Sequence, residues 1–427
     1  MAMFWRRLAV FGEEFRNSFR RFFSRQDATA TSFFGDGACC WLFRGANFVN
    51  RTRELLILRP DNIGDVVLFS GCLEHIRRLY PDYRITLAVQ PHIVNLVELC
   101  PWVDRVTGVR VRRRGRSLLS APIQAVARGV DRLRSVFGNR YEVVLFPLKS
   151  PDPDQLVLLS NHAAPEVFGL TGCCVNAPEG GYPAALAPDK LCTHVHDISG
   201  ADPWRHELAT NLEYLEFLGS PVKDVRDIGP VVWLSDADHA FSRFKDSAPS
   251  PIVGVFPCSF DPRKNWGLDN YVNWAKSLEM VGTFVIFGAA ADRNMASALA
   301  DSLHEARPSV AVINMVGQTT LRQLAAGIGT CDILFSVDSA GLHLGIAAGI
   351  PTVGIMGGWH FGRFAPWGDP ARHRIITHHL PCFGCNLMCH RQRHECLHAV
   401  TPSEVAACCN ELLGVFYHKQ PSDHRGE

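Results

Sequence analysis

Short apolar runs alternate with stretches of helical periodicity along most of the chain. Continuous apolar runs of about four to eight residues, bounded by turn residues, are typical of buried strands, whereas apolar residues at helical spacing predict helices. We predict strands at residues 55–58, 84–90, 103–109, 141–147, 251–260, 283–288, 310–317, 332–338 and 351–355. We predict helices from residue 64, near 94–99, at 206–218, 270–278, 295–304 and 321–328, after residue 339, and at 404–413. This alternation predicts an α/β fold whose parallel sheets are covered by helices on both faces.

One strand, helix and strand unit, at residues 334–358, carries a clear chemical signal. Its first apolar run ends at Asp338, and the small residues Ser339, Ala340 and Gly341 begin the helix. Unpaired N–H groups and the helix dipole attract anions at such a terminus, and α/β folds bind ligands at the carboxyl edge of the sheet. A diphosphate is therefore the first ligand to expect there.

The length of 427 residues exceeds what one hydrophobic core usually organises, so we predict more than one domain. Periodicity is weak between residues 151 and 202, where no strand or helix is predicted. The predicted parts are an N-terminal helix and linker (1–50), two Rossmann-like domains that face a central cleft (51–225 and 226–378), and a Cys/His-rich segment with a C-terminal helix (379–427).

Composition narrows the class of protein. The 43 Lys and Arg residues nearly balance the 42 Asp and Glu residues, which argues against a nucleic-acid partner. No run reaches the roughly 18 consecutive apolar residues of a membrane-spanning helix, and we expect no signal peptide. The 15 cysteines are scattered or in vicinal pairs, which favours a reducing cytoplasm.

The first residues form a basic, aromatic-rich amphipathic pattern. Phenylalanines and leucines recur at helical spacing between residues 4 and 25, with arginines around them. Such a helix can lie on the inner face of the cytoplasmic membrane, attracted by anionic lipids, so we expect a cytoplasmic protein with peripheral membrane contact through residues 4–25. The alternative is a helix packed on the protein body or on a partner.

Three motifs occur in an order that resembles a known family. They are Arg59-Pro-Asp-Asn-Ile-Gly-Asp65, Lys264-Asn-Trp266, and the segment from Asp338 to Gly357. Together they resemble glycosyltransferase family 9, the heptosyltransferases of lipopolysaccharide biosynthesis, over residues 54–413. The resemblance implies a GT-B fold, with an acceptor-side domain at 51–225 and a donor domain at 226–378.

The resemblance implies that Asp65 is the general base of an inverting transfer. A carboxylate can take the proton from an acceptor hydroxyl as that hydroxyl attacks the anomeric carbon. With an ordinary pKa near about 3.9, it would be ionised at neutral pH without tuning. The alternative is an acidic residue that offsets the helix dipole.

The remaining site residues are implied to hold the nucleotide-sugar donor. Backbone N–H groups of Ser339, Ala340 and Gly341, with the catalytic charge of Lys264, would neutralise the diphosphate. We expect no Asp-x-Asp motif that holds a divalent metal, so a metal-independent reaction is predicted. Other residues implied to lie near the donor are Thr319, Thr320, Asp338, His343 and Asp292.

Three of these assignments have alternatives. Asp338 could cap the helix that follows it, and a lone histidine such as His343 is often a structural hydrogen-bonding residue. Asp292 is displaced from the acidic position at which the family meets the donor ribose, because the chain reads Phe287-Gly-Ala-Ala-Ala-Asp292. ADP-heptose is therefore one candidate donor among nucleoside-diphosphate sugars.

A cysteine cluster near the C-terminus, flanked by histidines, has the composition of a metal site. Its members are Cys382, Cys385, Cys389 and Cys396. Four such ligands suit a structural tetrahedral zinc or iron site. Local disulfides and reduced thiols are the alternatives.

The predicted function is an inverting, metal-independent glycosyltransferase that moves a sugar, expected to be heptose, to an anionic lipopolysaccharide-core-like glycolipid or glycan. No cofactor is required for this chemistry. Five arginines between residues 110 and 116 are either a solvated loop or part of the acceptor site. The alternatives are a protein O-heptosyltransferase with a structural metal and a catalytically silent, membrane-attached sugar-binding scaffold.

Overall fold

The computed structural model describes residues 52–111, 141–162, 164–178 and 181–417. The predicted N-terminal helix and linker and most of the arginine run lie outside these ranges. Across the ranges that are described, no helix is both long enough and apolar enough to cross a membrane.

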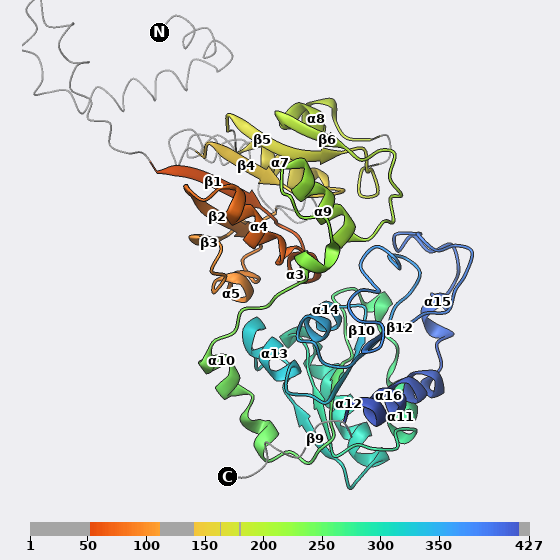
Figure 1. Ribbon diagram of the computed structural model, residues 1–427. Coiled ribbons are helices and arrows are strands. Elements are labelled where there is room, and N and C mark those ends of the chain that lie inside the picture. Colours follow the sequence, from red (N-terminus) through yellow and green to blue (C-terminus); the bar gives the residue numbers. More distant parts are fainter. Residues whose placement is uncertain (1–51, 112–140, 163, 179–180, 418–427) are drawn as a thin grey trace, which may run out of the picture. The chain divides into compact units, whose positions relative to one another are not determined.

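The first sheet contains six parallel strands in the order β3-β2-β1-β4-β5-β6 (Figure 1). Its strands are β1 (Arg53–Leu58), β2 (Tyr83–Val89), β3 (Arg105–Gly108), β4 (Val143–Phe146), β5 (Glu166–Thr171) and β6 (His194–Asp197). The chain runs outward from β1 to one edge and then outward from β4 to the other. This doubly wound arrangement has its topological switch point between β1 and β4.

The second sheet repeats the same design with six parallel strands in the order β12-β11-β10-β7-β8-β9. Its strands are β7 (Ile252–Phe256), β8 (Thr283–Ile286), β9 (Ala311–Asn314), β10 (Ile333–Val337), β11 (Thr352–Ile355) and β12 (His373–Ile376). Its switch point lies between β7 and β10. The predicted α/β class with two Rossmann-like sheets is confirmed.

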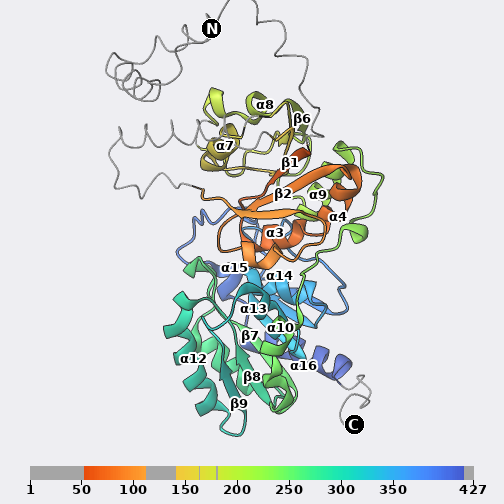
Figure 2. The ribbon, with the colours of Figure 1, turned by 90° about the vertical axis from the view of Figure 1, so that its left-hand side faces the viewer.

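Helices connect the strands and lie on both sides of the sheets (Figures 1 and 2). They are α3 (Ile63–Phe69), α4 (Cys72–Leu79), α5 (Val94–Val97), α7 (Pro153–Ser160), α8 (Pro188–Leu191), α9 (Glu207–Phe217), α10 (Asp236–Phe241), α11 (Leu268–Lys276), α12 (Arg293–Ala306), α13 (Leu321–Ile328), α14 (Ala340–Ala347), α15 (Glu395–His398) and α16 (Pro402–Phe416). Short 3₁₀ turns are η1 (Ala184–Leu186), η2 (Val225–Ile228), η3 (Arg243–Asp246), η4 (Pro262–Lys264) and η5 (Ala290–Asp292).

Alternate strand residues face different helices, as the period of two in a strand requires. On β1, Leu55 and Ile57 belong to one buried cluster, whereas Leu56 and Leu58 belong to another. On β10, Leu334 packs on the side of α13 and α14, whereas Phe335 packs on the side of α11, α12 and α16. Burial on both faces explains why these strands are continuous apolar runs.

The sequence pattern missed several elements. Residues 151–202 contain α7, β5, α8 and β6, and β12 was not predicted either. The edge strand β6 reads His-Val-His-Asp with every residue at least partly exposed, and β12 is half-buried beyond its first residue. Edge strands bury less surface, so they lack the apolar run on which the prediction depended. The sheets fall within 51–225 and 226–378, but the domain boundaries themselves stay a prediction.

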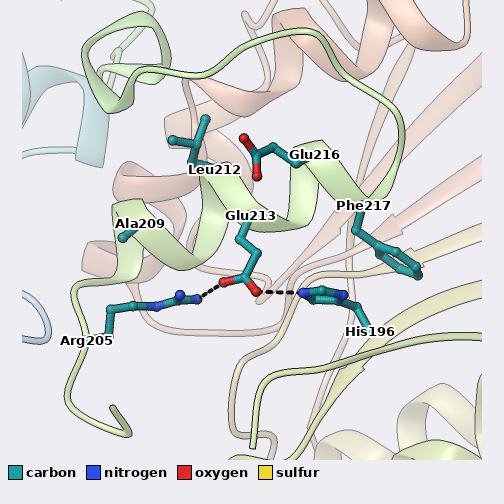
Figure 3. A pocket seen from close by; sticks show the side chains of 7 residues that line it. All are labelled: His196, Arg205, Ala209, Leu212, Glu213, Glu216 and Phe217. Atoms are coloured by element: carbon teal, nitrogen blue, oxygen red, sulfur yellow. Dashed lines mark hydrogen bonds and ion pairs between the residues drawn. The ribbon is translucent and has the colours of Figure 1, made fainter. Parts of the chain in front are cut away.

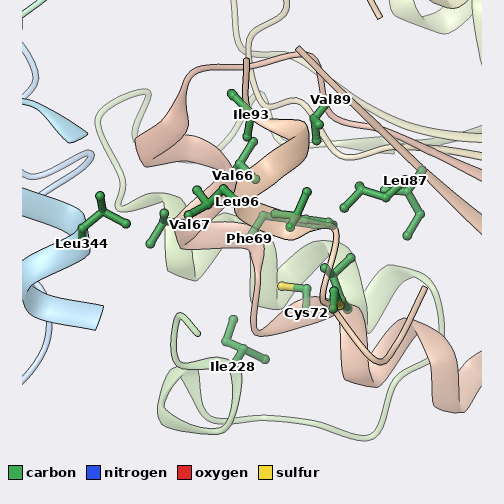
Figure 4. Packing of buried hydrophobic residues seen from close by; sticks show 14 of the residues in the cluster. Val66, Val67, Phe69, Cys72, Leu87, Val89, Ile93, Leu96, Ile228 and Leu344 are labelled. Carbon is green, nitrogen blue, oxygen red and sulfur yellow. The ribbon is translucent and has the colours of Figure 1, made fainter. Parts of the chain in front are cut away.

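One hydrophobic cluster extends from the first sheet to the second. It includes Val66 and Val67 of α3 together with Leu344 of α14, and Val67 and Leu344 face each other in Figure 4. The same cluster reaches Leu55 on β1 and Leu334 on β10. The two α/β halves, residues 52–235 and 236–417, thus share apolar packing.

Candidate functional site

The predicted catalytic residues follow the central strands of each sheet. Asp65 lies after β1, and Lys264 and Asp338 lie after β7 and β10. In open parallel sheets, ligands bind outside the carboxyl ends of the strands at the switch point. The fold therefore puts these three residues where a ligand is expected.

Asp65 is a half-buried carboxylate in the first turn of α3. Burial and the nearby charge of Asp61 raise its pKa to about 7, although Arg59 and Arg363 act in the opposite direction. The expected ordinary pKa near about 3.9 is therefore wrong. The sequence did not reveal that a second carboxylate stands beside Asp65 in a buried setting.

Arg59 organises the segment that leads to Asp65. Its side chain is fully buried, and its Nε lies 3.0 Å from Oδ2 of Asp61. Its Nη1 donates to the carbonyl of Pro147 (2.6 Å), and its Nη2 donates to the carbonyl of Asp65 (3.4 Å). These two hydrogen bonds and the ion pair of the buried guanidinium fix the start of α3 against the end of β4.

A second buried ion pair joins the two halves. Nε of Arg363 donates to Oε1 of Glu207 at 2.7 Å, and both side chains are less than a tenth exposed. The Glu207 backbone N–H also donates to the Arg363 carbonyl (2.8 Å). Burial alone would raise the pKa of Glu207, but the charges of Arg363 and Arg59 lower it, so this carboxylate is ionised.

Helices α3 and α14 meet at Gly64. A Cβ at this position would lie 2.7 Å from Cδ2 and 3.0 Å from Nε2 of His343. Real Cβ atoms do not approach that closely, so only glycine permits this contact. The residue next to the predicted base is therefore packed directly on the helix predicted to bind the diphosphate.

His343 is buried and neutral. Burial lowers its pKa to about 4, and its Nδ1 accepts a hydrogen bond from Nε1 of Trp367 (3.2 Å). Nε2 therefore carries the proton and is the nitrogen nearer to Gly64. His343 is a hydrogen-bonded packing residue at this junction, and its role toward a donor stays a prediction.

Lys264 and Asp338 form a buried pair. Nζ of Lys264 lies 2.7 Å from Oδ2 of Asp338, and Nε1 of Trp359 donates to the same oxygen (2.7 Å). Burial alone would raise the pKa of Asp338, but Lys264 and Trp359 lower it. Asp338 does not cap α14, because Ser339 occupies the N-cap position.

Helix α14 begins with the small residues that were predicted to bind a diphosphate, but the structure gives its glycine a packing role. Ser339 makes no side-chain cap, and its Oγ lies 3.3 Å from Oγ of Ser336. Ala340 begins the helix, and a Cβ on Gly341 would lie 2.4 Å from the ring of Phe256. The small residue at 341 thus permits packing on β7, and no side chain of the described residues accepts from the first N–H groups of the helix.

The other predicted donor residues lie at the carboxyl ends of β8 and β9. Thr320 caps α13 in a reciprocal capping box with Gln323, and Thr319 precedes it, half-buried. Oδ2 of Asp292 accepts from the backbone N–H of Ala289 (2.9 Å). Among the hydrogen bonds and ion pairs of the described residues, none links these three side chains to Lys264 or Asp338.

Two Asp-x-Asp triplets do occur, at residues 152–154 and 236–238. Asp152 caps α7, where its Oδ1 accepts from the Gln155 backbone N–H. Asp238 accepts from Ser235 and pairs with Arg322. These two carboxylates already have partners in helix capping and ion pairing, away from Lys264.

The predicted metal site at the cysteines is not supported. Within the described ranges, no group of three or more His, Cys, Asp or Glu side chains is placed to hold a metal ion. Cys396 is buried in the apolar cluster of the second half, and Cys385 packs against that cluster. All four cysteines are free thiols, so Cys396 acts as a small apolar side chain here.

A cavity of about 590 Å³ lies between β6 and α9, away from the predicted residues. Its centre is Glu213, whose carboxylate is held by Arg205 and by Nε2 of His196 at 2.6 Å (Figure 3). Among the described residues that line this cavity, the polar groups drawn at its centre are therefore already paired with one another.

A smaller cavity of about 310 Å³ lies at the carboxyl ends of β4, β5 and β6. Lys149 lines it, together with residues 172–175 and 198–203. Sequence reasoning missed Lys149, Glu207 and Arg363. For Lys149 and Glu207, the sequence signal was a charge at the end of a predicted strand and at the start of a predicted helix.

Comparisons with known proteins agree with the geometry. Residues 205–390 match the model of glycosyltransferase family 9 (heptosyltransferase), a range that includes Lys264 and Asp338. Lipooligosaccharide heptosyltransferase 2 of Campylobacter jejuni is 27% identical over 165 residues, 38% of this chain and 51% of that protein. Lipopolysaccharide core heptosyltransferase OpsX of Haemophilus influenzae is 25% identical over 335 residues, 75% of this chain and 84% of that protein.

A solved structure shares the fold. The Escherichia coli ADP-heptose lipopolysaccharide heptosyltransferase II has a TM-score of 0.61 and 19% identity, and the match covers 84% of this chain and 98% of that chain. The matched part of this chain spans about half the length of the Campylobacter relative. The structural likeness confirms the GT-B type of α/β fold.

Proposed function

We propose that this chain is a member of glycosyltransferase family 9 and transfers heptose from ADP-heptose to a sugar of a lipopolysaccharide core. The names of its relatives support the sugar and the class of acceptor, and the E. coli structural neighbour is an ADP-heptose enzyme. The observation that carries the proposal is the contact between Gly64 and His343, because it joins the segment of Asp65 to the helix that follows Asp338.

In the proposed reaction, Asp65 takes the proton from the acceptor hydroxyl. A base with a pKa near the working pH combines a useful fraction of the ionised form with a strong drive to accept a proton. The pKa of about 7 given by burial and by Asp61 meets this condition. The acceptor oxygen then forms its bond to the anomeric carbon as the bond to the diphosphate breaks. One displacement inverts the configuration of that carbon.

The charge that develops on the leaving diphosphate is stabilised by the donor half. Lys264 has three N–H donors, of which Asp338 takes one. The first N–H groups of α14 add the positive end of a helix dipole. These groups support a reaction that needs no divalent metal. The neutral His343 and the threonines near β9 would contact the donor.

The test compares Asp65→Asn and Asp65→Ala with the wild type at saturating ADP-heptose, with heptose-deficient lipopolysaccharide as acceptor. We expect turnover to fall by about 10²- to 10⁴-fold, the usual contribution of a general base. ADP should still raise the melting temperature of both variants, because the donor half is unchanged. Asp236→Asn is the matched control, since Asp236 is an exposed first-turn acid of α10. Undiminished turnover in the Asp65 variants would remove Asp65 as the base.

Two further measurements test the inversion of configuration and the independence of a divalent metal. NMR analysis of the product should show the anomeric configuration opposite to that of the donor, and retention would contradict a single displacement. Turnover should survive EDTA, and its loss with recovery on adding Mg²⁺ would contradict metal independence. The alternative of a protein O-heptosyltransferase depended on a metal at the cysteines, and it has lost that support.

A further inference from the structure

Lys149 is a buried cation that the proposed transfer does not use. Its side chain is 3% exposed, three residues beyond the end of β4. Its Nζ donates one hydrogen bond, to the carbonyl of Arg205 at 2.7 Å. Among the described residues no carboxylate lies within ion-pair distance of this ammonium. The nearby Glu207 is paired with Arg363 instead. Two of its three N–H donors have no acceptor within the described residues.

The free donors belong to a residue that lines the 310 Å³ cavity. This volume is at the lower end of the range for small-molecule sites. Apolar side chains such as Ile198 and Val175 form much of the wall, and a Cβ on Gly172 would lie 2.4 Å from the Ser199 nitrogen. The one carboxylate in the wall, Asp202, accepts from the Trp204 backbone N–H (2.9 Å). A buried cation in such a cavity is stabilised best by an anion.

One buried side chain, Arg59, is hydrogen-bonded both to the segment that leads to the cavity and to the residue proposed as the base. Two residues before Lys149, the Pro147 carbonyl accepts from Arg59, which also donates to the Asp65 carbonyl. Both Lys149 and Asp65 therefore lie at the switch point of the first sheet, after β4 and β1. The cavity and the proposed base thus lie at the same edge of the first sheet.

Hydrogen bonds between side chains and backbone hold the walls of the cavity. The Asn176 backbone N–H donates to Oγ of Ser150 (2.9 Å), which clamps the segment after β5 to the residue after Lys149. From the donor half, Nδ2 of Asn386 donates to the Val175 carbonyl (3.2 Å). The backbone of Asn386 is in the left-handed region, with φ of 47°, so this contact is built at some conformational cost.

We propose that Lys149 and this cavity form the subsite that binds an anionic group, a carboxylate or a phosphate, of the acceptor sugar. The inference rests on the proposed function and adds to it the residue that recognises the acceptor charge. Lys149 acts in binding and contributes nothing to the chemical step. Its loss should therefore raise the KM for the acceptor and leave the KM for ADP-heptose unchanged.

The kinetic test uses Lys149→Met with deacylated, heptose-deficient lipopolysaccharide core as acceptor. We expect the acceptor KM to rise by about 10- to 100-fold, the usual worth of a hydrogen bond to a charged group. Lys149→Arg, which keeps the charge, should retain part of the affinity. Lys223→Met is the control, because Lys223 is an exposed lysine paired with Glu216. An unchanged acceptor KM in Lys149→Met would overturn the proposal.

A binding test works without turnover. Cys174 is exposed and lines the cavity, so its alkylation by iodoacetamide, followed by peptide mass spectrometry, reports occupancy. The deacylated core should slow alkylation of the wild type and have no effect on Lys149→Met. Esterifying the carboxylates of the core or removing its phosphates identifies the anion, since only one treatment should abolish protection.

The two proposals fail in different ways. Protection of Cys174 by the anionic core without any heptose transfer would overturn the proposed function and support the subsite. Transfer in which esterified, dephosphorylated core protects as well as untreated core would overturn the subsite and leave the function intact. These wild-type arms decide the question even where Lys149→Met does not fold.

Discussion

The two halves of the molecule share one topology but treat a buried lysine differently. In each, six parallel strands run outward from a central switch point, and a lysine follows one of the two central strands. In the second half, the proposed donor half (residues 236–417), Lys264 is paired with Asp338 at 2.7 Å. In the first half, the proposed acceptor half (residues 52–235), the one acceptor that the described residues give Lys149 is a backbone carbonyl. The protein itself compensates Lys264, whereas the proposed subsite would complete Lys149 with an anionic ligand.

The acidic residues Asp338 and Asp65 also differ in how the surrounding side chains set their charge. The donor half keeps Asp338 ionised through Lys264 and Trp359, so its carboxylate is a fixed structural charge. The acceptor half places Asp65 beside Asp61, and burial with this like charge raises the pKa of Asp65 to about 7. The same fold thus supplies a stable charge on one side and a carboxylate of raised pKa on the other.

The largest expected effect concerns the two lysines. Lys264→Met should lower the free energy of unfolding by about 3–5 kcal/mol, because it leaves the buried Asp338 without its partner. Lys149→Met should cost less, since it leaves no buried carboxylate behind. Urea denaturation of the two variants measures the difference. Equal losses would contradict the distinction between them, and Lys264→Met/Asp338→Asn should recover part of the loss.

The next effect concerns the junction of the halves. Gly64→Ala forces a Cβ to within 2.7 Å of the His343 ring, so α3 must move away from α14. A displacement of about 1 Å between reacting groups costs roughly 100-fold in rate, and we expect such a fall in kcat. Gly414→Ala is the matched control, because a Cβ there meets nothing within 4 Å. Normal kcat in Gly64→Ala would show that the contact does not position the base.

The pH dependence of kcat/KM tests the carboxylate pair. Asp65 must be deprotonated to act as a base, so activity should rise with pH through about 7 and fall about tenfold per pH unit below it. Asp61→Asn removes a charge that raises the pKa of Asp65, so the rising limb should move to lower pH. Asp236→Asn should leave it in place. A limb that does not respond to Asp61→Asn would belong to another group.

The smallest effect is on stability. The folded-state pKa of Asp65, about 7, lies above its unfolded value, so the group favours folding below pH about 4 and this contribution is lost as pH rises through 7. Asp65→Asn cannot ionise, so it should melt above the wild type at pH 8 and equally near pH 4. Scanning fluorimetry at the two pH values measures this, and a lower melting temperature at pH 8 would contradict a raised pKa.

Sequence reasoning predicted the elements that are buried on both faces and the positions of Asp65, Lys264 and Asp338. The predicted helix at residues 321–328 has the bounds of α13. It could not predict the Arg363–Glu207 pair, because those residues lie 156 positions apart in the chain. It also failed on the pKa of Asp65, which depends on burial and on Asp61 rather than on residue type.

The cysteine segment shows a different limit. Its spacing and its histidines had the composition of a metal site, yet Cys396 is packed among apolar side chains. Composition shows which metal-binding side chains a segment contains, but the path of the backbone determines whether they come close enough to bind one metal ion. The left-handed residues Asn386 and Leu387 instead direct this segment toward the acceptor half, where Asn386 contacts Val175.

The apolar cluster that joins Val67 to Leu344 has a consequence for protein engineering. Neither half finishes its own core at this face, so a gene cut between the halves would give two fragments with exposed aliphatic surfaces that aggregate or find each other. A chimera that imports a donor half from a relative must therefore import matching side chains on α3 as well. A chimera therefore folds only if the side chains on both sides of this packed surface match, wherever in the linker the two genes are joined.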